Sequence, residues 1–235
     1  MKFCIIGDSW GTNVKIQFNY GCLDRILIDL GHKVVNISQG GASNFGQLLY
    51  LDFQILQNNI TDFDYIIWLH TEPARDFTEF IRLDYGNDSN SGKKQFPNLS
   101  FKNFVEDLDY LNYKNYVYAQ ELYDQYQIPF LVVGGAGKLS NSISNFKFVH
   151  WCMSSWTQKI LNLENAQMLP KNFYHHHVTK MCNGGFYNRI EVLDEISKLD
   201  NLEKITKTDV IKFPDSLHPA TYFYTLLLNE LLDHV

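Results

Sequence analysis

Hydrophobic runs of strand length alternate along this chain with longer stretches in which hydrophobic residues recur at helical spacing. The short apolar runs predict four strands, at 3–6, 33–37, 65–69 and 128–133, and a candidate fifth at 146–153. Helical spacing predicts helices at 18–30, 45–56 and 101–126, and a last helix that starts near Pro219 and runs through Leu232. Strands that alternate with helices form βαβ units, so the pattern predicts an α/β fold in which helices cover both faces of a parallel sheet.

One polar segment interrupts this pattern. Around 84–100, and most densely at 84–94, the chain is rich in Gly, Ser and Asn and has no hydrophobic periodicity. We interpret it as an insertion, for which a solvated loop is a simpler account than a lid over a site. The 235 residues are enough to bury one core, and we expect a single domain over 1–235.

Composition and charge narrow the classes of partner. The chain is 45% hydrophobic and 20% charged, which is typical of a globular protein. Its net charge of −6 offers no general attraction to phosphate backbones or anionic lipids, so we expect neither a nucleic-acid nor a membrane partner. The first apolar run is too short for a secretory signal, and no run approaches the roughly 20 apolar residues of a membrane helix. We therefore expect a cytoplasmic protein.

The cysteines and histidines do not suggest a metal site. The four cysteines are scattered and form no CxxC pair. His175, His176 and His177 lie near Cys182, but consecutive side chains on an extended chain point to alternating faces, and no further ligand stands at a recognised spacing. We expect no metal and no cofactor.

Chemically reactive residue types follow the first strand and precede the last helix. Ligands of a parallel sheet bind outside the carboxyl ends of its strands. Ser9, in the turn Gly7-Asp8-Ser9, can be a nucleophile there, although an ordinary helix cap is the simpler account of this turn taken alone. His218 and Asp215 supply the residue types of a general base and of the group that orients it.

Spacing alone does not single out this pair, because Asp29 and His32 have the same separation. His32 follows Gly31, which ends the first helix, and leads into the second strand. We therefore expect His32 at the amino-terminal edge of the sheet, opposite Ser9. The turn after the second strand contains Gly40 and Gly41, whose backbone N–H groups are candidates for an oxyanion hole, whereas a loop that needs a positive φ is the alternative explanation.

Three motifs together resemble the SGNH/GDSL hydrolase family. They are Gly7-Asp8-Ser9, then Asn36-x-Ser38-x-x-Gly41-Ala42-Ser43 and Asp215-x-x-His218, in the family's order and from one end of the chain to the other. The resemblance implies a flavodoxin-like three-layer α/β/α sandwich with about five parallel strands. It also implies that Ser9 attacks an ester carbonyl, that His218 is the base oriented by Asp215, and that the N–H groups of Ser9 and Gly41 belong to the oxyanion hole.

The third motif of that family is altered. The family has Gly-x-Asn-Asp after the third strand, and its asparagine donates to the oxyanion; the segment 68–76 of this chain contains no asparagine. Thr71 or His70 is expected to replace it, since each side chain can donate, whereas an ionised Glu72 cannot. If nothing replaced it, loss of one donor would cost on the order of 3 to 4 kcal/mol in the transition state.

Other residues near these motifs have expected roles as well. We expect Trp10, Asn44 and Glu72 to contact the substrate, and Arg75 and Asp76 to form a pair on the surface or behind the site.

The resulting hypothesis is a serine esterase that removes a short, acetyl-like acyl group from a small-molecule or glycan alcohol through an acyl-enzyme. An acyltransferase with the same residues is the nearest alternative. A glycan-binding or structural module without catalysis is the other, because the third motif is altered. The acyl group, the alcohol and the oligomeric state stay open.

Overall fold

The computed structural model describes residues 1–12, 23–57, 62–71, 76, 101–135, 139–156, 159 and 221–235, with only the backbone at 101–109 and 221–223. Within these ranges, five parallel strands form one sheet in the order β2-β1-β3-β4-β5. The sheet comprises β1 (Lys2–Gly7), β2 (Lys33–Asn36), β3 (Tyr65–His70), β4 (Phe130–Gly134) and β5 (Val149–Met153).

The burial of each strand follows its place in the sheet. The three central strands β1, β3 and β4 are almost wholly buried, and each is a nearly continuous apolar run. The two edge strands β2 and β5 are partly exposed. Strands covered on both faces need apolar side chains on both faces, which explains why these runs do not alternate with polar residues.

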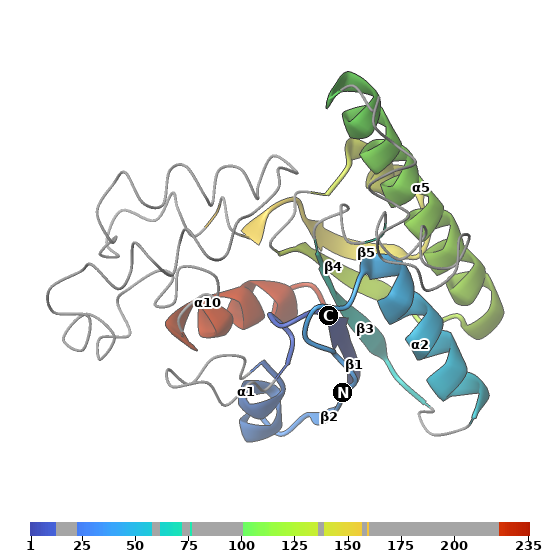
Figure 1. Ribbon diagram of the computed structural model, residues 1–235. Coiled ribbons are helices and arrows are strands. Elements are labelled where there is room, and N and C mark those ends of the chain that lie inside the picture. Colours follow the sequence, from blue (N-terminus) through green and yellow to red (C-terminus); the bar gives the residue numbers. More distant parts are fainter. Residues whose placement is uncertain are drawn as a thin grey trace, which may run out of the picture.

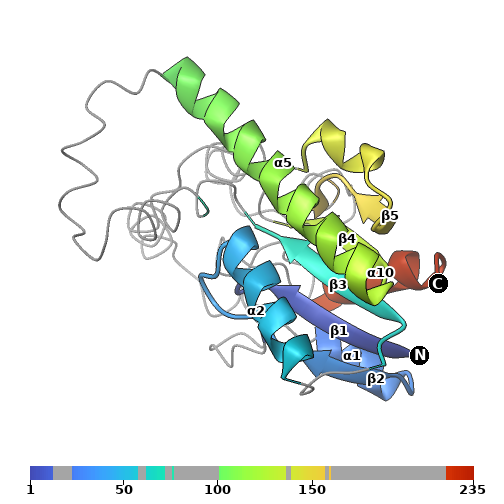
Figure 2. The same ribbon diagram turned by 90° about the vertical axis from the view of Figure 1, so that its right-hand side faces the viewer.

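Helices cover both faces of the sheet. Figure 1 shows α1 (Leu23–Asp29) and α10 (Thr221–Leu232) on one face and α2 (Asn44–Leu56) and α5 (Phe101–Tyr126) on the other. Figure 2, turned by 90°, shows α5 lying along the sheet beside α2. Right-handed crossovers explain the division, because the chain moves outward from β1 to β2 through α1 and returns to β3 through α2. The fold is therefore the predicted flavodoxin-like three-layer α/β/α sandwich.

A hydrophobic core lies between the sheet and the pair α2 and α5. Trp68 is fully buried there, with its ring 6.2 Å from those of Tyr116 and Phe130. Its indole Nε1 donates to Gln47 Oε1 at 3.0 Å, so the one polar atom of this ring is paired inside the core.

The predicted elements differ from the observed ones mainly at their ends. Gly31, at φ +87°, ends α1 as the sequence predicts, and α1 is described only from Leu23. The fifth strand begins at Val149 because a 3-10 helix, η1 (Asn141–Asn145), precedes it and the Phe146 N–H still bonds to Ile143 O. The insertion around 84–100 and the start of the last helix at Pro219 lie outside the described residues.

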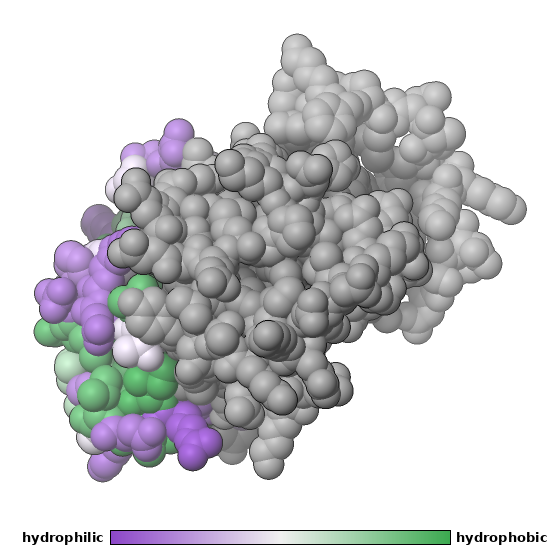
Figure 3. Space-filling model, turned by 90° about the vertical axis from the view of Figure 1, so that its left-hand side faces the viewer, coloured by the Kyte–Doolittle hydropathy of each residue, from purple (hydrophilic) through white to green (hydrophobic). Residues whose placement is uncertain are grey.

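Some large hydrophobic side chains remain exposed on the helices. Leu49, Phe53 and Leu56 of α2 are each about half exposed or more, as is Ile28 of α1. Figure 3 shows hydrophobic residues next to hydrophilic ones over the described part of one face. None of the helices in the described ranges combines the length and the apolar character needed to cross a bilayer.

Candidate functional site

Strands β1 and β3 are neighbours, and the chain continues from them in opposite directions. From β1 it goes to β2, and from β3 it goes to β4 and β5, so the order reverses between β1 and β3. In open α/β sheets the binding crevice lies at the carboxyl ends of the strands at this reversal. Ser9 follows β1 and Thr71 follows β3, so both lie at that place.

The turn that carries Ser9 is held mainly by Asp8. The Asp8 carbonyl accepts hydrogen bonds from the N–H groups of Gly11 (3.0 Å) and Thr12 (3.3 Å). The Asp8 carboxylate is buried; Oδ1 accepts from the Trp10 N–H at 2.9 Å and Oδ2 from the Thr71 hydroxyl at 2.8 Å. Ser9 itself is partly exposed, and its hydroxyl and N–H make no hydrogen bond with any residue of the described ranges.

Two glycines allow this turn to approach its neighbours closely. A Cβ on Gly7 would stand 2.9 Å from Leu69 Cβ of the adjacent strand, and one on Gly11 would stand 2.3 Å from Ser38 Oγ. Either contact is shorter than atoms tolerate, so the close approach of the chain to β3 at Gly7 and to the loop after β2 at Gly11 requires glycine at both positions.

The loop after β2 is tied to the Ser9 turn. The Asn36 amide donates to the Gly11 carbonyl at 2.7 Å and accepts from the Ser38 N–H at 3.0 Å. Gly41 follows in an exposed turn closed by the Ala42 N–H on Gln39 O at 3.0 Å. Gly41 has φ +81°, which suits glycine, and among the described residues its N–H has no acceptor. Gly41 therefore fits the alternative explanation, a loop that needs a positive φ. Its N–H has no acceptor among the described residues, so a ligand could still bind it.

Thr71 is buried, and both of its donors have partners. Its hydroxyl bonds to Asp8, and its N–H donates to Asn44 Oδ1 at 2.8 Å. A further role as an oxyanion donor would require the hydroxyl to leave the Asp8 carboxylate.

His70 points into the core. Its ring lies 5.1 Å from that of Trp68 and 5.9 Å from that of Tyr116, and it has no exposed surface. Within the described part of the chain, neither ring nitrogen has a hydrogen-bond partner of normal geometry. Burial lowers the pKa of His70 to about 3, and the Thr71 backbone offsets only part of this effect. The ring is therefore neutral at physiological pH.

Two residues expected to contact the substrate are buried instead among protein groups. Asn44 has no exposed surface, and its Nδ2 donates to Thr71 O at 3.1 Å and to Asp76 Oδ2 at 3.3 Å. Trp10 is 3% exposed, with its ring 5.5 Å from that of Trp156. These surroundings favour a structural role for both residues, in which they fix the loops at the carboxyl ends of the strands. Glu72 lies outside the described residues.

The last helix contacts the Ser9 turn. The hydroxyl of Tyr224, in α10, donates to the Trp10 carbonyl at 2.9 Å, and its ring lies 4.8 Å from that of Trp156. Asp215, His218, Arg75 and the run 175–177 with Cys182 lie outside the described ranges.

Comparison with known proteins finds likeness only among solved structures. No family model matches the chain, and no curated protein sequence matches it. The chain is similar to TesA, with 13% identity, a TM-score of 0.41, and coverage of 100% of this chain and 97% of that chain. It is also similar to the psychrotrophic esterase EstA from Pseudoalteromonas sp. (14% identity, TM-score 0.38, 99% and 95% covered). A GDSL-like lipase from Parabacteroides merdae has 11% identity, a TM-score of 0.41, and 99% and 94% covered.

The name of the Parabacteroides merdae protein, a GDSL-like lipase, includes that of the family whose motifs the sequence resembles. With TM-scores of 0.41 or less, however, the likenesses leave the chemistry of this chain to be argued from its own residues.

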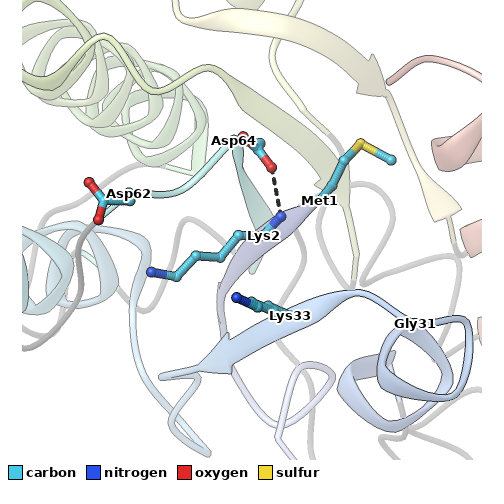
Figure 4. Close-up of a pocket in the computed structure, with 6 residues that line it drawn as sticks. All are labelled: Met1, Lys2, Gly31, Lys33, Asp62 and Asp64. Carbon is cyan, nitrogen blue, oxygen red and sulfur yellow. Dashed lines mark hydrogen bonds between the residues drawn. The ribbon is translucent and has the colours of Figure 1, made fainter.

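The amino-terminal edge of the sheet has different chemistry. His32 lies there as predicted, 5.3 Å from the Phe3 ring and beside the amino terminus, at the opposite end of β1 from Ser9. A shallow hollow of about 460 Å³ lies at this edge, and the Lys2 N–H donates to Asp64 there at 2.7 Å. Figure 4 shows the residues that line the hollow and this hydrogen bond. Its other lining residues are Met1, Gly31, Lys33 and Asp62. Within the described ranges, no three His, Cys, Asp or Glu side chains are grouped to hold a metal ion.

Sequence reasoning missed the role of two acidic residues at the carboxyl edge. Asp8 was read only as part of a motif, yet its carboxylate joins the loops after β1 and β3. Asp76 was expected to pair with Arg75; it is 2% exposed and accepts from the Phe45 N–H at 2.8 Å and from Asn115 Nδ2 at 2.8 Å. The position of each carboxylate in the chain, after the end of β1 or of β3, could have indicated from the sequence that both residues lie at this edge.

Proposed function

We propose that this protein is a serine esterase that hydrolyses a short, acetyl-like acyl ester, with Ser9 as nucleophile, His218 as general base and Asp215 as the group that orients His218. The observation that carries the proposal is the setting of Ser9. It stands in a tight turn at the reversal of strand order, partly exposed, and its hydroxyl makes no hydrogen bond with the described residues. A nucleophile needs such access to a substrate carbonyl.

The contact of α10 with the Ser9 turn supports the choice of base. His218 precedes Tyr224 by six residues, and the Tyr224 hydroxyl is 2.9 Å from the carbonyl of Trp10, the residue after Ser9. Six residues span up to about 20 Å when extended, so the length of chain between Tyr224 and His218 is sufficient for the proposed contact with Ser9. Asp215, three residues earlier, supplies the carboxylate that holds the imidazole in the required tautomer.

Backbone donors supply the oxyanion hole in this proposal. The N–H groups of Ser9 and Gly41 both lack acceptors among the described residues. Oriented N–H groups without a partner stabilise a developing oxyanion because they need no reorganisation. Of the two side chains expected as a third donor, Thr71 can serve only if its hydroxyl leaves the Asp8 carboxylate, and the His70 ring packs in the core.

The reaction then proceeds in two steps. His218 takes the Ser9 proton as Ser9 Oγ bonds to the acyl carbon, and it returns the proton to the departing alcohol, which leaves an acyl-enzyme. A water molecule gives its proton to His218 and attacks the acyl carbon; the proton returns to Ser9 as the acid leaves. No cofactor takes part. The alcohol is a small molecule or a glycan hydroxyl.

A fluorophosphonate probe and p-nitrophenyl acetate test this proposal on the full chain. We expect the wild type to be labelled and to release p-nitrophenol, and Ser9→Ala to lose both. Ser144→Ala is the matched control, because Ser144 is exposed in η1 and its hydroxyl bonds to Asn141 O. Labelling that persists in Ser9→Ala contradicts the proposal.

The same assay separates the alternatives. An added alcohol that takes up the acyl group in place of water indicates an acyltransferase. Absence of both labelling and turnover in the folded wild type indicates a module without catalysis.

A further inference from the structure

A chain of buried hydrogen bonds leads from the turn of Ser9 to helices α2 and α5. The first link is Asp8, whose carboxylate binds the Trp10 N–H and the Thr71 hydroxyl. The second link is the Asn44 amide, which pairs with the N–H (2.8 Å) and the carbonyl (3.1 Å) of Thr71. The third is Asp76, whose carboxylate accepts from Asn44 Nδ2 at 3.3 Å. Asp8, Thr71, Asn44 and Asp76 are each no more than 2% exposed.

Asp76 is the point at which this chain is anchored. Its carboxylate accepts from the Phe45 N–H in the first turn of α2 and from Asn115 Nδ2 of α5, and the Ser43 hydroxyl that caps α2 acts to lower its pKa. With Asn44, every neighbour named here is a donor. An ionised carboxylate has only acceptors, so it can accept from all of these donors at once.

The charge state of Asp76 is consistent with this arrangement. Burial raises the pKa of Asp76 to about 6, against the lowering effect of its four donors. The carboxylate is therefore ionised at pH 7.5. Its position beside the first N–H groups of α2 favours the negative charge further.

We propose that Asp76 is a positioning residue for the reaction at Ser9, because it holds Asn44 and, through Asn44 and Thr71, the carboxylate of Asp8 that shapes the nucleophile turn. This inference rests on the proposed function. Asp76 touches no reacting atom; it sets where the Ser9 hydroxyl and N–H stand relative to the substrate. A displacement of about 1 Å in such a group can reduce turnover by up to a hundredfold.

The chain offers a matched control for a purely structural role. Asp52 is a second carboxylate between the same two helices; it accepts from the hydroxyls of Tyr118 (3.1 Å) and Tyr126 (2.9 Å) of α5. Asp52→Asn therefore weakens the contact between α2 and α5 without touching the links to Ser9.

Steady-state turnover of p-nitrophenyl acetate at pH 7.5, with thermal unfolding measured in parallel, tests the proposal. We expect Asp76→Asn to lower kcat by on the order of tenfold while KM stays within about twofold, and Asp52→Asn to keep kcat within about twofold. Fluorophosphonate labelling of Ser9 slows in the same proportion as kcat. An unchanged kcat in folded Asp76→Asn, or equal losses in the two variants, overturns the proposal.

Substitutions at two further positions cover the case in which Asp76→Asn does not fold. Asn115→Ala removes one donor to Asp76 and keeps the carboxylate, and it is expected to lower kcat less than Asp76→Asn in the same direction. Thr71→Val removes the bond to Asp8 and lowers kcat, whereas Thr71→Ser keeps the hydroxyl and restores it. A wild-type kcat in folded Asn115→Ala or Thr71→Val overturns the proposal. Turnover by wild type that does not depend on Ser9 overturns the proposed function as well, which distinguishes the two failures.

Discussion

The Tyr224 hydroxyl donates a hydrogen bond of 2.9 Å to the Trp10 carbonyl, which lies 214 residues away in the chain. Tyr224 has no exposed surface, and its ring packs at 4.8 Å against Trp156, which in turn lies 5.5 Å from Trp10. This contact joins the last helix to the turn that follows the first strand. The turn of Ser9 and helix α10 are therefore held together by a buried aromatic cluster.

Tyr224→Phe is expected to lower turnover by loosening this contact. The variant keeps the ring and leaves the Trp10 carbonyl without this donor, which costs about 1 kcal/mol or more of stability. Tyr118→Phe loses a comparable bond, to Asp52, remote from Ser9, and serves as the control. We expect kcat for p-nitrophenyl acetate to fall several-fold in Tyr224→Phe only. Equal kcat values in the two variants would show that the hydrogen bond between Tyr224 and the Trp10 carbonyl does not serve the reaction.

Removal of the base provides a direct check on the proposed mechanism. Imidazole ordinarily titrates near pH 6.5, so the wild-type rate is expected to rise through about pH 6 to 7. His218→Gln is expected to lose this rise along with most of the turnover, with Ser9 labelling slowed to match. A wild-type profile that is flat from pH 5 to 8 would exclude His218 as the base.

His70→Phe is expected to be neutral or stabilising at pH 7 and to protect the fold against acid. The pKa of His70 is lowered to about 3 in the folded chain, whereas an unfolded histidine titrates near 6.5. The unfolded state therefore binds the extra proton first, and stability is lost as the pH falls below about 6.5, by up to about 1.4 kcal/mol per pH unit. A phenylalanine ring buries no unpaired nitrogen and does not titrate.

Urea unfolding of both proteins between pH 4 and 7 tests this expectation. Asp76 acts with the opposite sign, because its pKa is raised to about 6 and it therefore favours folding as the pH falls from 6 towards 3.8. Asp76 is common to wild type and His70→Phe, so the difference between them isolates His70. A difference that does not change with pH would show that His70 has the same pKa in the folded and the unfolded chain.

Gly11→Ala is expected to destabilise the protein, whereas Gly40→Ala is not. The new methyl group at position 11 would meet Ser38 Oγ at 2.3 Å and Ser38 Cβ at 2.9 Å, but at position 40 nothing lies within 4 Å. Overpacking of this kind typically costs 1 to 3 kcal/mol. Thermal unfolding measures both variants, and equal midpoints would mean that the two loops do not pack as closely as described.

The elements and their order follow from local sequence. Apolar runs too short for helices became the central strands, and Gly31 ended α1 at a positive φ, because these outcomes depend on neighbours within a few residues. The sheet order followed in turn, since right-handed crossovers leave few topologies for such a succession. The same reasoning placed His32 and Ser9 at opposite edges.

Which way the polar side chains face depended on the tertiary structure. Asn44 and Trp10 looked like substrate contacts, yet Asn44 pairs with Thr71 across 27 positions and the Trp10 carbonyl bonds to Tyr224 across 214. Asp76 is anchored by Asn115, 39 positions away. A buried polar group must find a partner wherever the fold supplies one, and that partner is set by which loops meet rather than by local sequence. The sequence by itself determined the strands, the helices and the edge at which the turns of Ser9 and Gly41 lie; only the packing of distant loops decided which residues of these loops face outward and which hold the turn of Ser9 in place.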